Sequence, residues 1–396
     1  MEKLLDILEK ENSHIRCYRT KKYSIEENTS DIIEYDDTNR KPSELKKTSF
    51  AETEQTNAPT VNISNHLIAT TQGKPLFTYF LDGSRHCYMI DDILIGDKIY
   101  PLGGGEIIVG CCSRKDGKFK SEKIFQQIVI SAPKNIDDKE DGEPYLRSLL
   151  DKFNYSIQKG PKALQTLGIS IDKVLKYAID GGQSNLDKKE FKSRLVAKIQ
   201  NEMTDHEQIM VRELCNEGKL DDDNWLIKDG SIEYNQNFSN IENNIKSIVE
   251  KTNYKHVVGI SKSFNPDLIK DYKGKKLSKT IAELKPFERT KVYRYEYQTG
   301  RGDSSYFGIW YLRLRKNSFR ETNFSDIVKC EVLLDGETGK IDTEQVDLLS
   351  ANIINEAYPT CYGNDTRWAN HLYPVYLTEK FCKSRYRDSN IILNLF

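Results

Sequence analysis

The alternation of apolar and polar positions predicts a strand-rich segment followed by a long helix. Between residues 77 and 130, the apolar runs FTYFLDG, HCYMIDDILI, EIIVGCC and KIFQQIVIS predict three or four strands joined by short turns, an antiparallel meander. The PLGGG stretch is interpreted as one of these turns, since no Gly-Lys-Ser/Thr follows to make it a phosphate loop. Apolar residues then recur at steps of three or four from Phe191 to Leu214, which predicts a helix that Gly218 stops.

The second half of the chain changes period. The segments NWLIKDG and HVVGISKSF predict two buried strands, and NFSNIENNIKSIVEKTN between them predicts an amphipathic helix, so these strands should pair in parallel. KVYRYEYQ, YFGIWYLRLR and IVKCEVLL have strand composition, whereas EQVDLLSANIINEAY and the segment around WANHLYPVYLTEKF predict helices. A meander followed by alternating units predicts an α/β fold, with a mixed sheet flanked by helices.

The N-terminal region differs from the rest. Residues 1–20 predict a short helix with Leu4, Leu5, Ile7 and Leu8 on one side, and residues 25–62 are polar and poor in large apolar side chains. We therefore expect two parts. Residues 1–65 would form a helix and polar arm that serves docking or dimerisation, and residues 66–396 would form the compact domain.

Composition limits the classes of function. The 59 basic and 60 acidic residues give a net charge of −1, so no overall field recruits nucleic acid or an anionic membrane, and a nucleic-acid site must be local. No apolar stretch approaches the roughly 20 residues that span a bilayer, and the N-terminus lacks the apolar core of a signal peptide. These features predict a cytoplasmic protein without membrane contact. The eight cysteines have no CxxC spacing, which favours reduced, structural thiols.

The triplet Asp-Gly-Ser occurs twice, each time at the end of an apolar run, and places Asp82 and Asp229 in similar positions. A single copy would indicate a hairpin turn. Two copies on neighbouring strands would bring both carboxylates to one edge of a sheet, where they would repel unless a cation lay between them. Mg²⁺ or Mn²⁺ suits such oxygen ligands and can activate water for phosphodiester cleavage.

Further ligands are sought in the long helix, where Glu202, Glu207 and Glu213 lie near the edge of the apolar stripe. Glu207 is chosen because it lies one turn after Met203 and one turn before Met210, which would direct it toward the sheet. The alternative, a solvated helix glutamate, remains open for each of the three. Near the C-terminus, Tyr358 and His371 are further candidates, although a lone histidine more often packs than binds a metal.

In this order, the motifs resemble the NurA family of nucleases. The resemblance rests on DGSR at 82–85, a helical glutamate, LIKDGSI at 226–232, VVGISKS at 257–263, WYLRL at 310–314, KCEVL at 329–333, and a late Tyr-Pro followed by Ala-x-His. It covers about residues 75 to 385. It implies an RNase H-like core, a divalent metal, typically manganese, a homodimer whose channel admits DNA, and partnership with a HerA-type hexameric DNA-translocating ATPase.

Carried over by position, the resemblance implies roles for individual residues. Asp82 and Asp229 resemble the family's two aspartate ligands, and Glu207 its helical acid, with Glu213 left open because GKLDDDN lengthens the interval. His371 and Tyr358 resemble its late histidine and tyrosine, although CYGNDTRW separates the two more widely than the family pattern does.

Two basic residues in the resembling motifs, Lys262 and Arg313, would contact backbone phosphate. For both, surface solvation and pairing with a nearby acid remain open.

These observations predict a metal-dependent deoxyribonuclease in which Asp82, Asp229, Glu207 and His371 bind Mn²⁺ or Mg²⁺. It would work with a HerA-like ATPase in DNA end processing or in defence against phage. The alternative is a catalytically degenerate NurA-like subunit that clamps DNA or docks on an ATPase.

Overall fold

The computed structural model describes most of the chain. The described residues are 2–25, 50–54, 58–71, 73–137, 145–160, 162, 168–179, 188–232, 253–267, 276–298, 304–316, 322–334, 338–362 and 367–396. Residues 237–252 of the amphipathic helix predicted over NFSNIENNIKSIVEKTN, and most of the polar arm, lie outside these residues.

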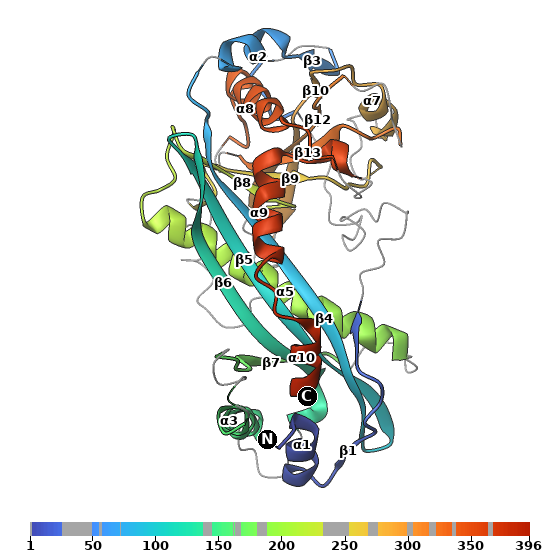
Figure 1. Cartoon of the computed structure of the whole chain (residues 1–396). Helices are drawn as coiled ribbons and strands as arrows, with labels where there is room; N and C mark the ends of the chain where they lie inside the picture. The colour runs from blue at the N-terminus through green and yellow to red at the C-terminus, as the bar shows by residue number, and fades with distance from the viewer. Residues whose placement is uncertain are drawn as a thin grey trace.

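The described strands form one large mixed sheet. Its main path runs β3-β10-β12-β13-β9-β8-β4-β5-β6-β7. The longest strands of the sheet form the predicted meander. They are the antiparallel strands β4 (Phe77–Ile95), β5 (Lys98–Lys115) and β6 (Lys118–Pro133). These long strands run through the length of the elongated molecule in Figure 1, and they link the upper group of elements around β12 to the lower group around α1. The mixed α/β sheet flanked by helices is thus confirmed.

The meander is less broken than the sequence predicts. Asp82, Gly83 and Ser84 lie inside β4, opposite residues 108–110 of β5, and the PLGGG stretch lies inside β5, so neither forms a turn. The glycines instead permit close packing of α5 (Lys188–Asn216). A Cβ at Gly103 would lie 2.6 Å from a Leu195 side-chain atom, and one at Gly83 would lie 2.4 Å from Glu207 Oε1.

The second half of the sheet agrees with the predicted pattern. β8 (Trp225–Asp229) pairs in parallel with β4, and β9 (Val257–Ser261) pairs in parallel with β8. Antiparallel strands β13 (Ile327–Leu333) and β12 (Ser304–Arg313) continue the sheet beyond β9, and both β11 (Tyr293–Gln298) and β10 (Glu288–Thr290) pair with β12.

Parts of the N-terminal region also join this sheet. Helix α1 (Leu4–Glu11) buries the predicted leucine and isoleucine face, and it ends earlier than predicted. The chain then forms β1 (Ile15–Cys17) and β2 (Tyr23–Ile25), which pair with β4. Strand β3 (Thr60–Asn62) pairs with β10, and α2 (Ser64–Thr71) follows it.

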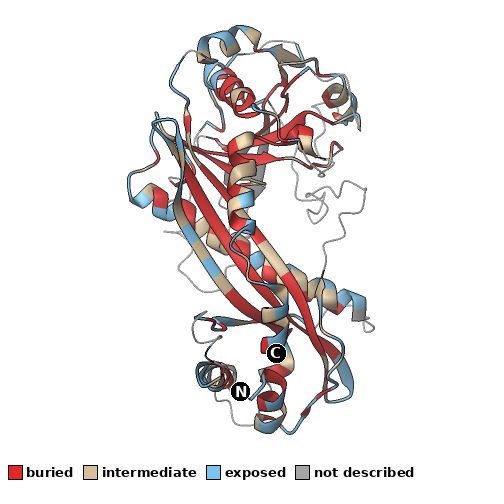
Figure 2. Ribbon diagram, viewed as in Figure 1, coloured by how far each residue is buried: buried red, intermediate tan, exposed pale blue. Residues whose placement is uncertain are grey.

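Helices cover both faces of the meander. Glycines of β5 alternate between the faces: a Cβ at Gly105 would meet Ile199 of α5, whereas one at Gly110 would meet Cys382 of α9 (Tyr373–Lys383). The two helices therefore lie on opposite faces, as Figure 1 shows. Along β4 and β5 most residues are buried, whereas the first half of β6 is largely exposed or half-buried (Figure 2).

The remaining helices and strand lie at the two ends of the meander. Near the lower end are η3 (Lys134–Asp137), α3 (Tyr145–Gln158), β7 (Lys173–Tyr177) and α10 (Ser389–Leu395), whereas α7 (Ser278–Ala282), α8 (Thr343–Glu356) and η4 (Trp368–Asn370) belong to the upper group.

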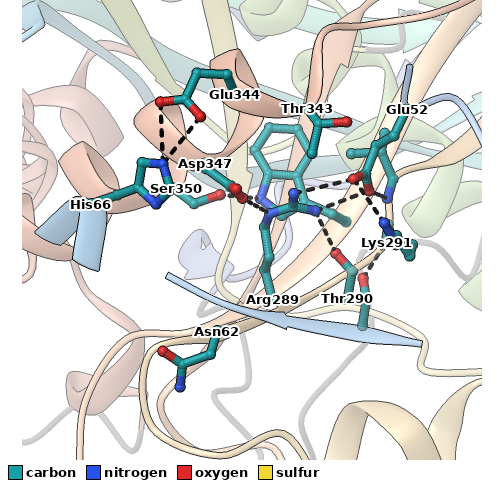
Figure 3. A network of polar contacts seen from close by, with 12 residues as sticks. Glu52, Asn62, His66, Arg289, Thr290, Lys291, Thr343, Glu344, Asp347 and Ser350 are labelled. Atoms are coloured by element: carbon teal, nitrogen blue, oxygen red, sulfur yellow. Dashed lines mark hydrogen bonds and ion pairs between the residues drawn. The ribbon is translucent and has the colours of Figure 1, made fainter. Parts of the chain in front are cut away.

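A buried ion network, here called the Glu52 network, fixes residues 50–54 to the upper part of the sheet. It consists of Glu52, Arg289, Lys291 and Asp347 (Figure 3). Arg289 Nη1 lies 2.9 Å from Glu52 Oε1, Lys291 Nζ lies 3.3 Å from Glu52 Oε2, and the Arg289 guanidinium also bonds the Asp347 carboxylate.

Two expectations from composition can be compared with the structure. All eight cysteines are free thiols, and seven of them are buried, as predicted for structural cysteines. Within the described part of the chain, the helices are all too short or too polar to cross a membrane.

Candidate metal centre

Three carboxylates from three different elements converge beside α9. Asp82 lies in β4, Asp229 ends β8 and Glu379 lies in α9, and one oxygen from each lies within 4.8 Å of the others. We call this group the acidic centre. Its aspartates meet because β4 and β8 are neighbouring parallel strands, in which Leu81 pairs with Lys228, the residues directly before the two aspartates.

Strand alternation explains which side chains share a face. Gly83 adjoins Glu207 of α5, so Asp82, the preceding residue, points to the opposite face, where α9 lies. In β8, Lys228 bonds Glu207 and the next residue, Asp229, points toward Lys262 and the α9 side. The sheet thus separates a Glu207–Lys228 pair from the acidic centre.

A lysine lies within the acidic centre. Lys262 directly follows β9, and its Nζ lies 2.7 Å from Asp229 Oδ2 and 3.4 Å from Glu379 Oε2. Its side chain is only 9% exposed. The Asn370 side chain donates a hydrogen bond to the Lys262 carbonyl oxygen at 3.0 Å, which holds the lysine backbone in place. The resemblance implies that Lys262 contacts backbone phosphate. In the structure its ammonium group pairs with Asp229 and Glu379, which is the alternative that the sequence left open.

The electrostatic environment makes the three acids unequal. Burial, followed by repulsion from Asp229, raises the pKa of Asp82 well above its usual range. Burial alone would also raise the pKa of Glu379, but Lys262 and Lys383 outweigh it and lower the pKa to about 2. Asp82 Oδ2 is buried and accepts no hydrogen bond from any described residue. Asp82, the most buried acid of the centre, therefore has a carboxylate oxygen that could accept a further ligand.

Glu207 is not one of the three acids that converge. It is buried as predicted, but its Oε2 lies 2.8 Å from Lys228 Nζ on the α5 face of the sheet. The physical reason is the period of two along β4 and β8, which the helical spacing around Glu207 does not reveal. The two other acids of the long helix also have partners: Glu202 bonds Lys173, and Glu213 is half exposed and bonds Lys123.

The two late residues behave differently from each other. His371 is buried, and its Nδ1 lies 4.0 Å from Glu379 Oε2, so it adjoins the acidic centre through Glu379. Tyr358 is 49% exposed, and its ring stacks on the Arg315 guanidinium at 5.2 Å. The structure thus brings the histidine, and not the tyrosine, into contact with the centre.

Arg313, for which the resemblance implies a contact with backbone phosphate, is fully buried. Its guanidinium donates hydrogen bonds to the carbonyl oxygens of Leu284, Ser325 and Ala282, at distances of 2.6 to 3.2 Å. An arginine in β12 with these partners holds α7 and the loop before β13 against the sheet.

Glu379 is the member of the acidic centre that the sequence motifs do not reveal. A signal was present in α9, because Val375, Thr378 and Cys382 are buried at positions i, i+3 and i+7. Glu379 occupies position i+4 of the same stripe, so it is an acid on the face that packs against the sheet. An ionisable residue inside a buried stripe indicates a paired or functional group.

The chain was compared with protein families, curated proteins and solved structures. No protein-family model matches the chain, and no curated protein matches it. Among solved structures, it is similar to the NurA nuclease from Sulfolobus solfataricus. The similarity covers 81% of this chain and 86% of that chain, with 12% sequence identity and a TM-score of 0.35. A TM-score this low does not establish a shared activity, so the interpretation of the site depends on its own residues.

Proposed function

We propose that this protein is a NurA-like, divalent-metal-dependent deoxyribonuclease with an RNase H-like core, and that the acidic centre is its active site. The observation that carries the proposal is the convergence of Asp82, Asp229 and Glu379 around an oxygen of Asp82 that has no partner among the described residues. DNA as substrate follows from the resemblance of the DGSR, LIKDGSI and VVGISKS motifs to the NurA family.

The donor set fits a hard divalent cation. All three groups offer carboxylate oxygens, which suit Mg²⁺ and Mn²⁺. A buried carboxylate oxygen without a hydrogen-bond partner is costly, and a bound cation would remove that cost. When bound by these residues, Mn²⁺ or Mg²⁺ supplies Lewis-acid chemistry for hydrolysis of a phosphodiester.

The residues of the chain have separate tasks in this proposal. Asp82, Asp229 and Glu379 hold the cation. His371 lies next to the Glu379 carboxylate and positions it. Lys262 contributes positive charge next to the ligands, where a substrate phosphate would approach. Glu207 and Lys228 neutralise each other on the other face and support β8.

Partnership with a HerA-type hexameric ATPase, a homodimer that admits DNA, and a role in end processing or phage defence stay predictions from the resemblance. A motor that delivers DNA would explain how a chain with a net charge of −1 acts on a polyanion. Copurification with the ATPase and light scattering would test the partner and the dimer.

The decisive experiment compares cleavage of end-labelled linear DNA with Mn²⁺, with and without a HerA-like ATPase. We expect Asp82→Asn, Asp229→Asn and Glu379→Gln each to lower the rate on the order of a thousandfold or more, because each removes a cation ligand. Glu213→Gln is the matched control, since Glu213 is a half-exposed acid paired with Lys123, and it should cleave like wild type.

If wild type cleaves nothing with any metal or ATPase, yet binds DNA or the ATPase, the degenerate clamp is the better interpretation. If the three variants cleave as well as wild type, the acidic centre is not the active site.

A further inference from the structure

The acidic centre already contains a cation of its own. Lys262 Nζ contacts two of the three acids, Asp229 at 2.7 Å and Glu379 at 3.4 Å, from a side chain that is 9% exposed. The backbone of Lys262 is fixed in place, because it follows a fully buried strand and its carbonyl oxygen accepts a hydrogen bond from the Asn370 side chain. The lysine is therefore built into the centre and does not reach it from solvent.

The charge balance leaves room for a single divalent ion. With all three acids ionised, as ligands of a cation are, three carboxylates and one ammonium give the centre a formal charge of −2. Lys383 also bonds Glu379, but it is half exposed, so solvent screens its charge. One divalent cation neutralises a charge of −2, whereas a second one would leave a buried net charge of +2. The open Oδ2 of Asp82 is the acceptor left for that single ion.

We propose that Lys262 is a resident cation that competes with divalent ions for Asp229 and Glu379 and limits the centre to one ion per chain. The proposal rests on the metal-dependent function inferred above and specifies its stoichiometry. In a two-ion site, the second ion stabilises charge on the reacting phosphate. A lysine in that place supplies positive charge without binding a second ion.

The experiment measures Mn²⁺ binding without DNA, by isothermal titration calorimetry and native mass spectrometry of the full-length protein. Wild type should bind one ion. Lys262→Met should bind a second ion, or bind the first at least about tenfold tighter, because it removes a buried positive charge that contacts two of the ligands. Lys262→Arg keeps the charge and should resemble wild type.

Lys383→Met is the matched control. It removes a charge from the same carboxylate, Glu379, but at a half-exposed position, so its stoichiometry and affinity should stay close to those of wild type. Thermal unfolding in EDTA and in Mn²⁺ accompanies the titrations. We expect Lys262→Met to be less stable than wild type in EDTA and to gain more from Mn²⁺.

The outcomes separate this proposal from the proposed function. Two ions in wild type, or a Lys262→Met protein that binds Mn²⁺ as Lys383→Met does, would overturn the role of Lys262. Two ions in wild type would overturn it even if Lys262→Met does not fold. If wild type binds no Mn²⁺ at any concentration, it is the metal-dependent function that fails.

Discussion

The Glu52 network and the acidic centre are both groups of buried charges, and they differ in charge balance. The Glu52 network has two acids and two bases, and each of its charged groups contacts a group of opposite charge. The acidic centre has three acids and one lysine, and Asp82 Oδ2 has no hydrogen-bond partner among the described residues. Both groups are removed from water, yet only one is neutral.

The difference indicates two uses of buried charge. A balanced network costs desolvation but is compensated by its own ion pairs, so it can fix the segment around Glu52 between β10 and α8. An unbalanced cluster is destabilising by itself, and such a cluster is tolerated where a ligand completes it. We therefore expect mutations in the Glu52 network to lower the stability of the protein. Mutations in the acidic centre should mainly alter ligand binding.

The largest effect on stability is expected from Arg289→Met. It removes the arginine that pairs with Asp347 and one of the two basic partners of Glu52, and breaking such a buried pair costs about 3–5 kcal/mol in the free energy of unfolding. Urea denaturation measures the loss. Lys276→Met, which breaks an exposed pair with Asp267, should cost at most about 1 kcal/mol. Weakened Mn²⁺ binding in folded Arg289→Met would show that the two groups are coupled.

Glu207→Gln tests the boundary between structural and functional charge. It weakens the partner of a buried lysine, Lys228, so we expect a loss of about 1–3 kcal/mol in the free energy of unfolding. Mn²⁺ affinity should stay close to that of wild type, whereas Glu379→Gln should reduce it strongly. The opposite result, loss of Mn²⁺ binding in Glu207→Gln alone, would make Glu207 the ligand that its position in the sequence first suggested.

The smallest effect, and one of opposite sign, is expected from Asp82→Asn in EDTA. Because the pKa of Asp82 is raised in the folded protein, its protonated form favours folding. That contribution is complete below the usual pKa of an aspartate and is lost as pH rises through the raised pKa. At neutral pH the variant should therefore be more stable than wild type, by about 0.5–2 kcal/mol.

Thermal unfolding from about pH 4 to pH 8 measures this effect, and the gain from Asp82→Asn should shrink toward the acidic end. Saturating Mn²⁺ should reverse the order, because only wild type binds it well. A variant that is less stable than wild type at neutral pH in EDTA would mean that ionised Asp82 is compensated by the protein itself.

Much of the fold could be predicted because local periodicity records it. The stripe from Phe191 to Leu214 indicates α5, and the apolar runs around Ile227 and Val258 indicate two parallel strands. The expected breaks at residues 82–84 and 103–105 were wrong for a physical reason. Glycine in a strand and glycine in a turn look alike in a sequence, and only the packing of α5 distinguishes them.

The acidic centre shows the same limit. The sequence determined that Asp82 and Asp229 follow similar apolar runs, and this was sufficient to predict that they lie together. Only the tertiary structure decided which further groups join them. Glu207 lies on the other face of the sheet and pairs with Lys228. The packing of α9 brings Glu379 to the aspartates, although Glu379 follows Asp229 by 150 residues in the sequence. Local spacing fixes the face on which a side chain lies in its own element, whereas the neighbour that meets this face is chosen by long-range packing.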